Sequence, residues 1–127
     1  MARIELRQRQ ADGDILVIEA DGELDAETAE TFTRKVEQIV AGGAKQLVVD
    51  CTLLDAVSSA GVSAIMFLNR RMQQCGGDVK LAGVKGLVRD VLKVMRLDRV
   101  LAIYDTVADA RRAFNESPDP SNASPGE

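Results

Sequence analysis

The chain has 127 residues and a mass of 13.7 kDa, which is the size of one ordinary domain. Apolar residues make up 46% and charged residues 28%, a composition typical of folded globular proteins rather than of disordered or fibrous ones. The chain contains no histidine, which excludes every mechanism that needs imidazole as general base, metal ligand or triad member. The two cysteines, Cys51 and Cys75, form no C-x-x-C pair, so neither a zinc cluster nor a disulfide scaffold is indicated.

The charge pattern argues against nucleic acid as a partner, and the hydropathy pattern argues against membrane insertion. The formal net charge of −4 has the wrong sign for a nucleic-acid-binding protein, and the four aromatic residues are scattered singly. The first residues are charged, and no apolar run approaches the roughly 20 residues that span a bilayer. We therefore expect a cytoplasmic protein without membrane insertion. The segment 12–30 carries eight acidic residues and no lysine or arginine, which fits either a solvated face or a surface that steers a partner.

The first half of the chain predicts a hairpin, a helix and a central strand. The stretches IELRQRQ and DILVIEA flank the turn signal at residues 11–14, as in an antiparallel hairpin. Apolar residues then recur at helical spacing over 29–40, with Asp25 placed to cap the start and Gly42-Gly43 to end the helix. The fully apolar run LVVD at 47–50 is typical of a strand covered on both faces.

The second half alternates helices and strands. A second helix is predicted from Ser59 to Gly76-Gly77, a strand at 79–84, a third helix over 87–95, a strand LAIY and a short last helix opened by Thr106. The side chains expected to face inward are Val62, Ile65, Met66, Asn69 and Met72 on the second helix, Leu87, Val88, Val91, Leu92 and Met95 on the third, and Val107, Ala110 and Phe114 on the last. This order predicts an α/β fold with a mixed, mostly parallel sheet, an N-terminal antiparallel hairpin and about four helices.

Residues 115–127 contain all three prolines and a single small apolar residue. Such a segment cannot bury a core, so we expect a folded domain over 1–114 followed by a disordered tail over 115–127.

Few residues carry catalytic potential. Asp50 ends the central strand and Asp55 is expected in the loop that follows, where open α/β sheets place their sites. The pair could serve acid–base chemistry, or Asp50 could accept backbone N–H bonds in the turn. The glycine pairs fit no phosphate-binding motif, and the cysteines are more simply explained as packing residues. No catalytic residue, cofactor or metal site is indicated.

The segment 54–62 is more informative. Ser58 and Ser59 lie where the second helix begins, so one of them is expected to be the N-cap. Gly61 lies in the first helical turn, where alanine would be favoured by about 1 kcal/mol, which suggests that another group approaches closely. With Ala60 it would leave a serine hydroxyl on a smooth surface, within reach of a partner or a kinase. A phosphate there would add about −1.5 to −2 charges beside Asp55 and repel an acidic partner.

Over residues 3–114 the order of these elements resembles the STAS domain of bacterial anti-sigma factor antagonists. The segments that carry the resemblance are VSSAGV, which opens the second helix, then KLAGV, LVRDVLKVMRLDRVLAIY and Asp105–Ala110. The resemblance implies a STAS fold in which Ser59, two residues before Gly61, is the phosphorylated position. It also implies that the unphosphorylated protein binds an anti-sigma factor with serine kinase activity, that phosphorylation releases it, and that a phosphatase restores binding. The common motif of the family is Asp-Ser-Ser-Gly, whereas this chain has Ser58 in place of the acid, which makes Ser58 the alternative phosphoacceptor.

The sequence thus predicts a regulatory binding module that is not an enzyme. The expected partner-binding residues are Asp55, Ser58, Ser59, Ala60, Gly61, Arg70 and Gln73. One alternative is a STAS subunit of a lipid or anion transport complex that binds its ATPase without phosphorylation, and a small enzyme is a third. Self-association as a homodimer stays open.

Overall fold

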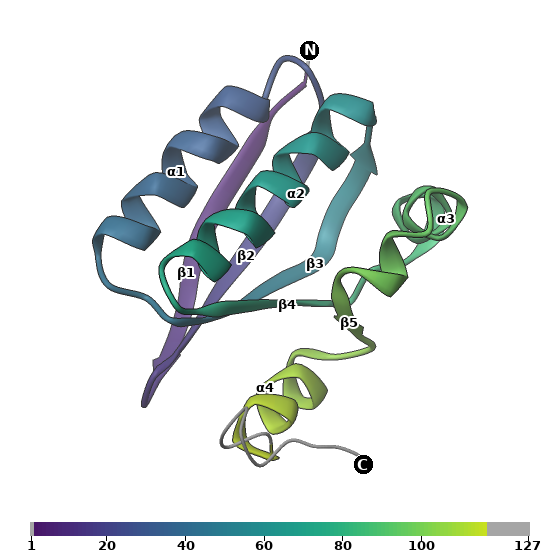
Figure 1. Ribbon diagram of the computed structural model, residues 1–127. Helices are drawn as coiled ribbons and strands as arrows, with labels where there is room; N and C mark the ends of the chain where they lie inside the picture. Colours follow the sequence, from purple (N-terminus) through teal and green to yellow (C-terminus); the bar gives the residue numbers. More distant parts are fainter. Residues whose placement is uncertain (1, 117–127) are drawn as a thin grey trace.

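The computed structural model describes residues 2–116 and places them in a five-stranded sheet with helices on both faces (Figure 1). The strands are β1 (Ile4–Asp12), β2 (Ile15–Leu24), β3 (Gln46–Val57), β4 (Asp78–Ala82) and β5 (Ala102–Tyr104), in sheet order β1-β2-β3-β4-β5. β1 pairs antiparallel with β2 around Gly13, whose φ of +62° suits a tight turn, and the other neighbours are parallel. The predicted mixed α/β sheet with its antiparallel edge is confirmed.

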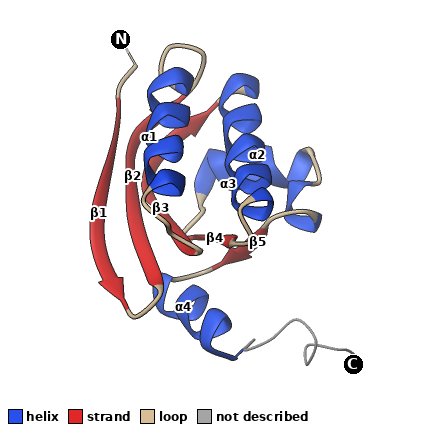
Figure 2. Cartoon of the chain, turned by 60° about the vertical axis from the view of Figure 1, so that its left-hand side comes forward, coloured by secondary structure: helices blue, strands red, loops and turns tan. Residues whose placement is uncertain are grey.

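Three helices cover one face of the sheet: α1 (Ala29–Ala41), α2 (Ser59–Gln74) and α3 (Gly86–Val94) (Figure 2). Their inward stripes enclose the main core, which includes Phe32, Val36, Leu68, Met72 and Leu92, each at most 3% exposed. Burying a side chain of this size contributes about 1.5–3 kcal/mol. Arg71 joins α1 to α2, because its guanidinium donates to both carboxylate oxygens of Glu37, at 2.9 and 3.0 Å.

The last helix, α4 (Val107–Glu116), lies on the opposite face and buries Ala110 and Phe114 there, as predicted. Thr106 caps its start, since the hydroxyl accepts the backbone N–H of Asp109 at 3.0 Å. α4 extends two residues past the expected end of the folded domain at 114. The rest of the expected disordered tail, from residue 117 onward, lies outside the described residues.

The central strand is longer than expected. β3 continues to Val57 rather than ending at Asp50, because β2 runs on to Leu24 and pairs with it as far as Val57, with two irregularities in the register. The expectation that Asp55 lies in a loop is therefore wrong: Asp55 is an exposed residue of β3.

Fewer apolar side chains of the third helix are buried than its sequence predicts. Val88 and Leu92 are buried and Val91 is half-buried, but Leu87 is 72% exposed and Met95, the residue that follows α3, is 48% exposed. The reason is that α3 packs through one narrow stripe, and no other element among residues 2–116 covers its outer side. Between residues 2 and 116 no helix is long and apolar enough to cross a membrane.

Candidate functional site

The junction of β3 and α2 is held by Ser58. This residue is the N-cap of α2: its hydroxyl accepts the backbone N–H of Gly61 at 3.4 Å, and its carbonyl accepts that of Val62 at 2.8 Å. Its own N–H donates to the carbonyl of Leu24 at 3.0 Å, which ties the start of α2 to the end of β2. The prediction that one of the two serines caps the helix is confirmed, and the cap is Ser58.

Ser59 has a different environment, although it is the next residue. It is the first residue of α2, it is exposed, and its hydroxyl forms no hydrogen bond with any residue between 2 and 116. Unpaired backbone N–H groups of the first helical turn lie beside it, at the positive end of the helix dipole. This position favours an added anion such as a phosphate, which would be placed at the surface without disturbing the cap.

Gly61 is buried, and the group that approaches it comes from inside the molecule. A Cβ at this position would lie 2.1 Å from the carbonyl oxygen of Leu24 and 2.7 Å from Cγ2 of Val57. The expectation that Gly61 forms a smooth surface for an external partner is therefore wrong. Only glycine lets the first turn of α2 lie against the end of β2, and this contact fixes where Ser59 is presented.

The structure divides the expected partner-binding residues between the two ends of α2. Ser58, Ser59 and the half-buried Ala60 lie together at its start, just beyond the exposed Asp55. Arg70 and Gln73 are exposed as expected, but they lie 11 and 14 residues further along. At about 1.5 Å per residue this is about 16 and 21 Å from Ser59. A partner that touches all of them must cover the length of the helix.

The carboxylates and thiols of the central strand serve the fold. The carboxylate of Asp50 accepts the backbone N–H of Thr52 at 3.0 Å and its hydroxyl at 2.6 Å. The expected bond to a backbone N–H is confirmed, but it forms inside β3 rather than in a turn. Burial raises the pKa of the Cys51 thiol to about 12, so this residue is protonated at neutral pH and unreactive. Cys75 is half-buried and follows the last residue of α2, in agreement with a packing role. Within residues 2–116 no cluster of three potential metal ligands occurs.

The acidic run over 12–30 does not form one surface. Glu19 and Asp21 bind the guanidinium of Arg7 on the uncovered part of the sheet, at 3.1 and 2.6 Å, and this hydrogen bond lowers the pKa of Asp21. Asp25 accepts the backbone N–H groups of two residues before α1. The solvated, structural interpretation accounts for these members of the run.

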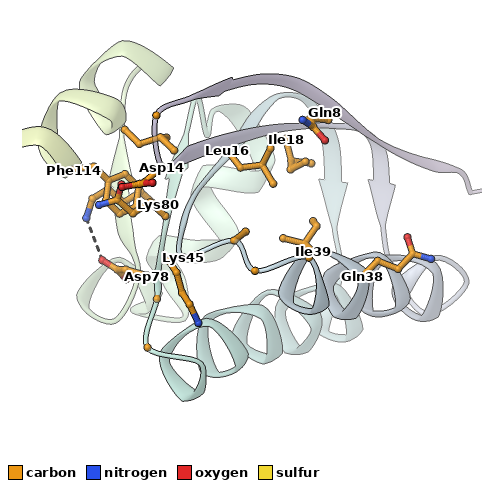
Figure 3. Close-up of a pocket in the computed structure, with 18 of the residues that line it drawn as sticks. Gln8, Asp14, Leu16, Ile18, Gln38, Ile39, Lys45, Asp78, Lys80 and Phe114 are labelled. Carbon is orange, nitrogen blue, oxygen red and sulfur yellow. Dashed lines mark hydrogen bonds and ion pairs between the residues drawn. The ribbon is translucent and has the colours of Figure 1, made fainter.

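A hollow of about 1110 Å³ lies at the opposite end of the sheet from Ser59, beside the β1–β2 turn and the ends of α1 and α2 (Figure 3). The two lysines labelled in this view already have partners. Lys80 pairs with Asp78 at 3.3 Å and lies 4.4 Å from the centre of the Phe114 ring. The amine of Lys45 donates to the carbonyl of Cys75. The carboxylate of Asp14, which is also drawn there, is exposed to solvent and forms no ion pair with any residue between 2 and 116. Among the described residues no buried side-chain nitrogen or oxygen lacks a hydrogen-bond partner, so the hollow contains no buried unpaired group that points to a ligand.

Comparison with known proteins identifies the family. The profile of the STAS domain matches residues 6–110. The chain belongs to the STAS domain family. A curated relative from Bordetella bronchiseptica, named "Putative anti-sigma factor antagonist BtrV", is 24% identical over 111 residues, which are 87% of this chain and 95% of the relative.

Solved STAS structures share this fold across different roles. An anti-sigma factor antagonist from Mycobacterium paratuberculosis has 22% identity and a TM-score of 0.79, covering 89% of this chain and 95% of the other. A sulfate transporter family protein from Wolinella succinogenes has 14% identity and a TM-score of 0.70, covering 85% and 89%. At these identities the structural likeness shows the STAS fold, and the function has to be argued from the site.

Two features of the site were not found from the sequence. The carbonyl of Leu24 positions Gly61, and this contact joins residues that are 37 positions apart. The second feature is the exposure of α3 and of the 3-10 helix η1 (Leu97–Arg99) that follows it. The helical spacing over 87–95 predicts an inward position for Leu87 and Met95 and gives no signal of this exposure.

Proposed function

We propose that this STAS domain is an anti-sigma factor antagonist that works by partner switching. In the unphosphorylated state it binds an anti-sigma factor with serine kinase activity. Phosphorylation of Ser59 by that kinase releases it, and a phosphatase restores binding. In this proposal the chain is a binding module in the cytoplasm and performs no catalysis itself.

The observation that carries the proposal is the difference between the two serines. Both serines are exposed, but the hydroxyl of Ser58 is engaged as the helix cap, whereas that of Ser59 makes no hydrogen bond within residues 2–116. The family motif has Asp where this chain has Ser58, and both residue types are good N-caps, so the replacement keeps the geometry of the helix start. Modification of Ser59 would add about −1.5 to −2 charges to the contact surface and leave the cap in place.

Release follows from electrostatics rather than from unfolding. A phosphate on Ser59 is stabilised by the N-terminus of α2, so the domain stays folded. A partner surface that packs against the neutral hydroxyl would instead have to desolvate a dianion next to Asp55. The affinity of the partner therefore falls.

Binding of Ser59 variants tests the proposal. The partners are the purified kinase-type anti-sigma factors of the organism that encodes this chain, and the affinity is measured by isothermal titration calorimetry. Ser59→Ala should bind like the wild type, and Ser59→Asp should bind at least about tenfold more weakly, a difference of about 1.4 kcal/mol. Gln38→Asp is the matched control, because it adds the same charge on an exposed residue of α1 outside the expected contact surface and should keep its affinity. Equal binding of Ser59→Asp and wild type would refute the switch.

The alternative is a STAS subunit of a membrane transport complex for lipids or anions, in constant contact with its ATPase. The specific observation in its favour is the shared fold of the sulfate transporter family protein. In that role Ser59 would carry no phosphate under any growth condition, and Ser59→Asp would leave the complex intact.

A further inference from the structure

The outer side of α3 and η1 exposes large apolar residues that the core does not use. We call this set the α3–η1 surface; its cations and large apolar residues are Lys85, Leu87, Arg89, Lys93, Val94, Met95, Arg96, Arg99 and Val100, and two acids, Asp90 and Asp98, are exposed on the same elements. The exposed fractions of Leu87, Val94 and Val100 are 72%, 81% and 55%. Four of the five large apolar residues that are markedly exposed within residues 2–116 belong to this surface. An apolar group of this kind, surrounded by charges, is typical of a binding site.

The cations of this surface have no ionic partners. Elsewhere Arg7, Arg71 and Arg112 bind carboxylates at 2.6–2.9 Å. In contrast, none of the five cations of the α3–η1 surface forms an ion pair with any residue between 2 and 116. The segment 85–100 holds five cations and two acids, a net charge of +3 in a chain of −4, so the remaining residues carry −7.

Arg96 has an unusual backbone conformation. Arg96 lies between α3 and η1 with φ at +59°, and it is the single non-glycine residue with positive φ among residues 2–116. At the end of a helix this conformation favours glycine. An arginine at this position costs stability, and its exposed side chain makes no ion pair within residues 2–116 that would compensate for the cost.

We propose that the α3–η1 surface is a docking site for an acidic protein, whose carboxylates pair with the five cations and whose apolar residues cover Leu87, Val94 and Val100. The fit follows from charge complementarity and from composition, because arginine and methionine are enriched in protein interfaces. This inference rests on α3 and η1 and does not depend on the phosphorylation of Ser59.

Two other ligand classes fit less well. A membrane-bound surface is typically rich in Trp and Phe, whereas the aromatic residues of this chain, Phe32, Phe67, Tyr104 and Phe114, are buried or half-buried and lie outside this surface. The −7 charge of the rest of the chain also opposes an anionic bilayer. Nucleic acid would leave the apolar residues uncovered, because no aromatic side chain on this surface could stack on a base.

Site-specific cross-linking in the source organism tests the proposal on the full chain. A photoreactive benzoylphenylalanine replaces Val94 in one strain and Thr31, an exposed residue of α1, in the control strain. We expect an adduct with an acidic protein at position 94 that is absent at position 31. That protein is then purified, and its affinity for the uncross-linked chain is measured at several salt concentrations.

The affinity of the wild type for this partner should fall as the salt concentration rises. Lys93→Glu and Val94→Asp should each bind the partner at least about fivefold more weakly than the wild type. Arg34→Glu on α1 makes the same charge change outside the surface and should have no effect. Arg96→Gly separates function from structure: it should weaken binding while raising the urea midpoint of unfolding, because glycine relieves the positive φ. If Arg96 had a purely structural role, Arg96→Gly would instead lower both the affinity for the partner and the urea midpoint of unfolding.

Three results would overturn the proposal. The first is the absence of an adduct above the Thr31 background. The second is an adduct with phospholipid or nucleic acid alone, which would assign the surface to those ligands. The third is a purified partner that binds the wild type, Lys93→Glu and Val94→Asp with equal affinity.

Discussion

Two regions differ in whether their polar side chains have hydrogen-bond partners: the open sheet face of β1 and β2, and Ser59 at the start of α2. On the sheet face Arg7 donates to Glu5, Glu19 and Asp21, so a single guanidinium is shared by three carboxylates. At the start of α2 the hydroxyl of Ser59 has no partner within residues 2–116. Groups that hold the fold are satisfied internally, whereas the group that we assign to regulation is left exposed. The predictions below test this distinction.

The largest effect is expected from Gly61→Ala. Its Cβ would lie 2.1 Å from the carbonyl oxygen of Leu24, so α2 must shift away from β2. Overpacking against backbone should cost at least about 3 kcal/mol in the free energy of unfolding, measured by urea denaturation. Gly42→Ala is the control, because its Cβ would meet nothing closer than 3.4 Å, and it should stay within about 1 kcal/mol of the wild type. A Gly61→Ala protein as stable as the wild type would contradict this geometry.

Ser58→Ala and Ser59→Ala should differ in stability although they are neighbours. Ser58→Ala removes the cap of α2 and should lower the free energy of unfolding by about 1 kcal/mol. Ser59→Ala removes a hydroxyl without a partner and should change it by less than about 0.5 kcal/mol. Both values come from urea denaturation. Equal losses in the two variants would mean that the serines are equivalent, and the distinction between them would fail.

The ion pairs on the open sheet face should make the stability of the protein depend on pH. The hydrogen bond to Arg7 lowers the pKa of Asp21 from its ordinary value of 3.8, so the stabilisation is complete above that pH and is lost as pH falls through the lowered pKa. Arg7→Met should therefore be less stable than the wild type at pH 7, with the difference shrinking below pH 3.8. Urea midpoints at several pH values measure it. A difference that stays constant down to pH 2 would show that packing, rather than charge, is what Arg7 contributes.

The smallest stability effect is expected from Val94→Ser. This side chain is 81% exposed, so shortening it should change the free energy of unfolding by less than about 0.5 kcal/mol. Val88→Ser, six residues earlier on the buried stripe, is the contrasting variant and should be strongly destabilised. A comparable loss in both variants would mean that the outer side of α3 is covered.

Local patterns in the sequence were enough to predict the hairpin, the α/β order and the cap at the start of α2. They failed where the outcome depends on distant partners. β3 continues past Asp50 because β2 pairs with it up to Leu24, and no pattern within 47–57 contains that information. Leu87 and Met95 have helical spacing suited to burial, yet both stay exposed because no element of the described chain packs over them. Gly61 was correctly singled out for a close contact, but its partner, Leu24, lies on another strand.

The central claim is that Ser59 carries the regulatory phosphate, and mass spectrometry of the protein from its own cells tests it most directly. The account predicts an intact-mass shift of about 80 Da for one added phosphate. Fragmentation of the tryptic peptide should locate this phosphate on Ser59 in part of the molecules. A phosphate on Ser58, or none under any growth condition, would contradict the account.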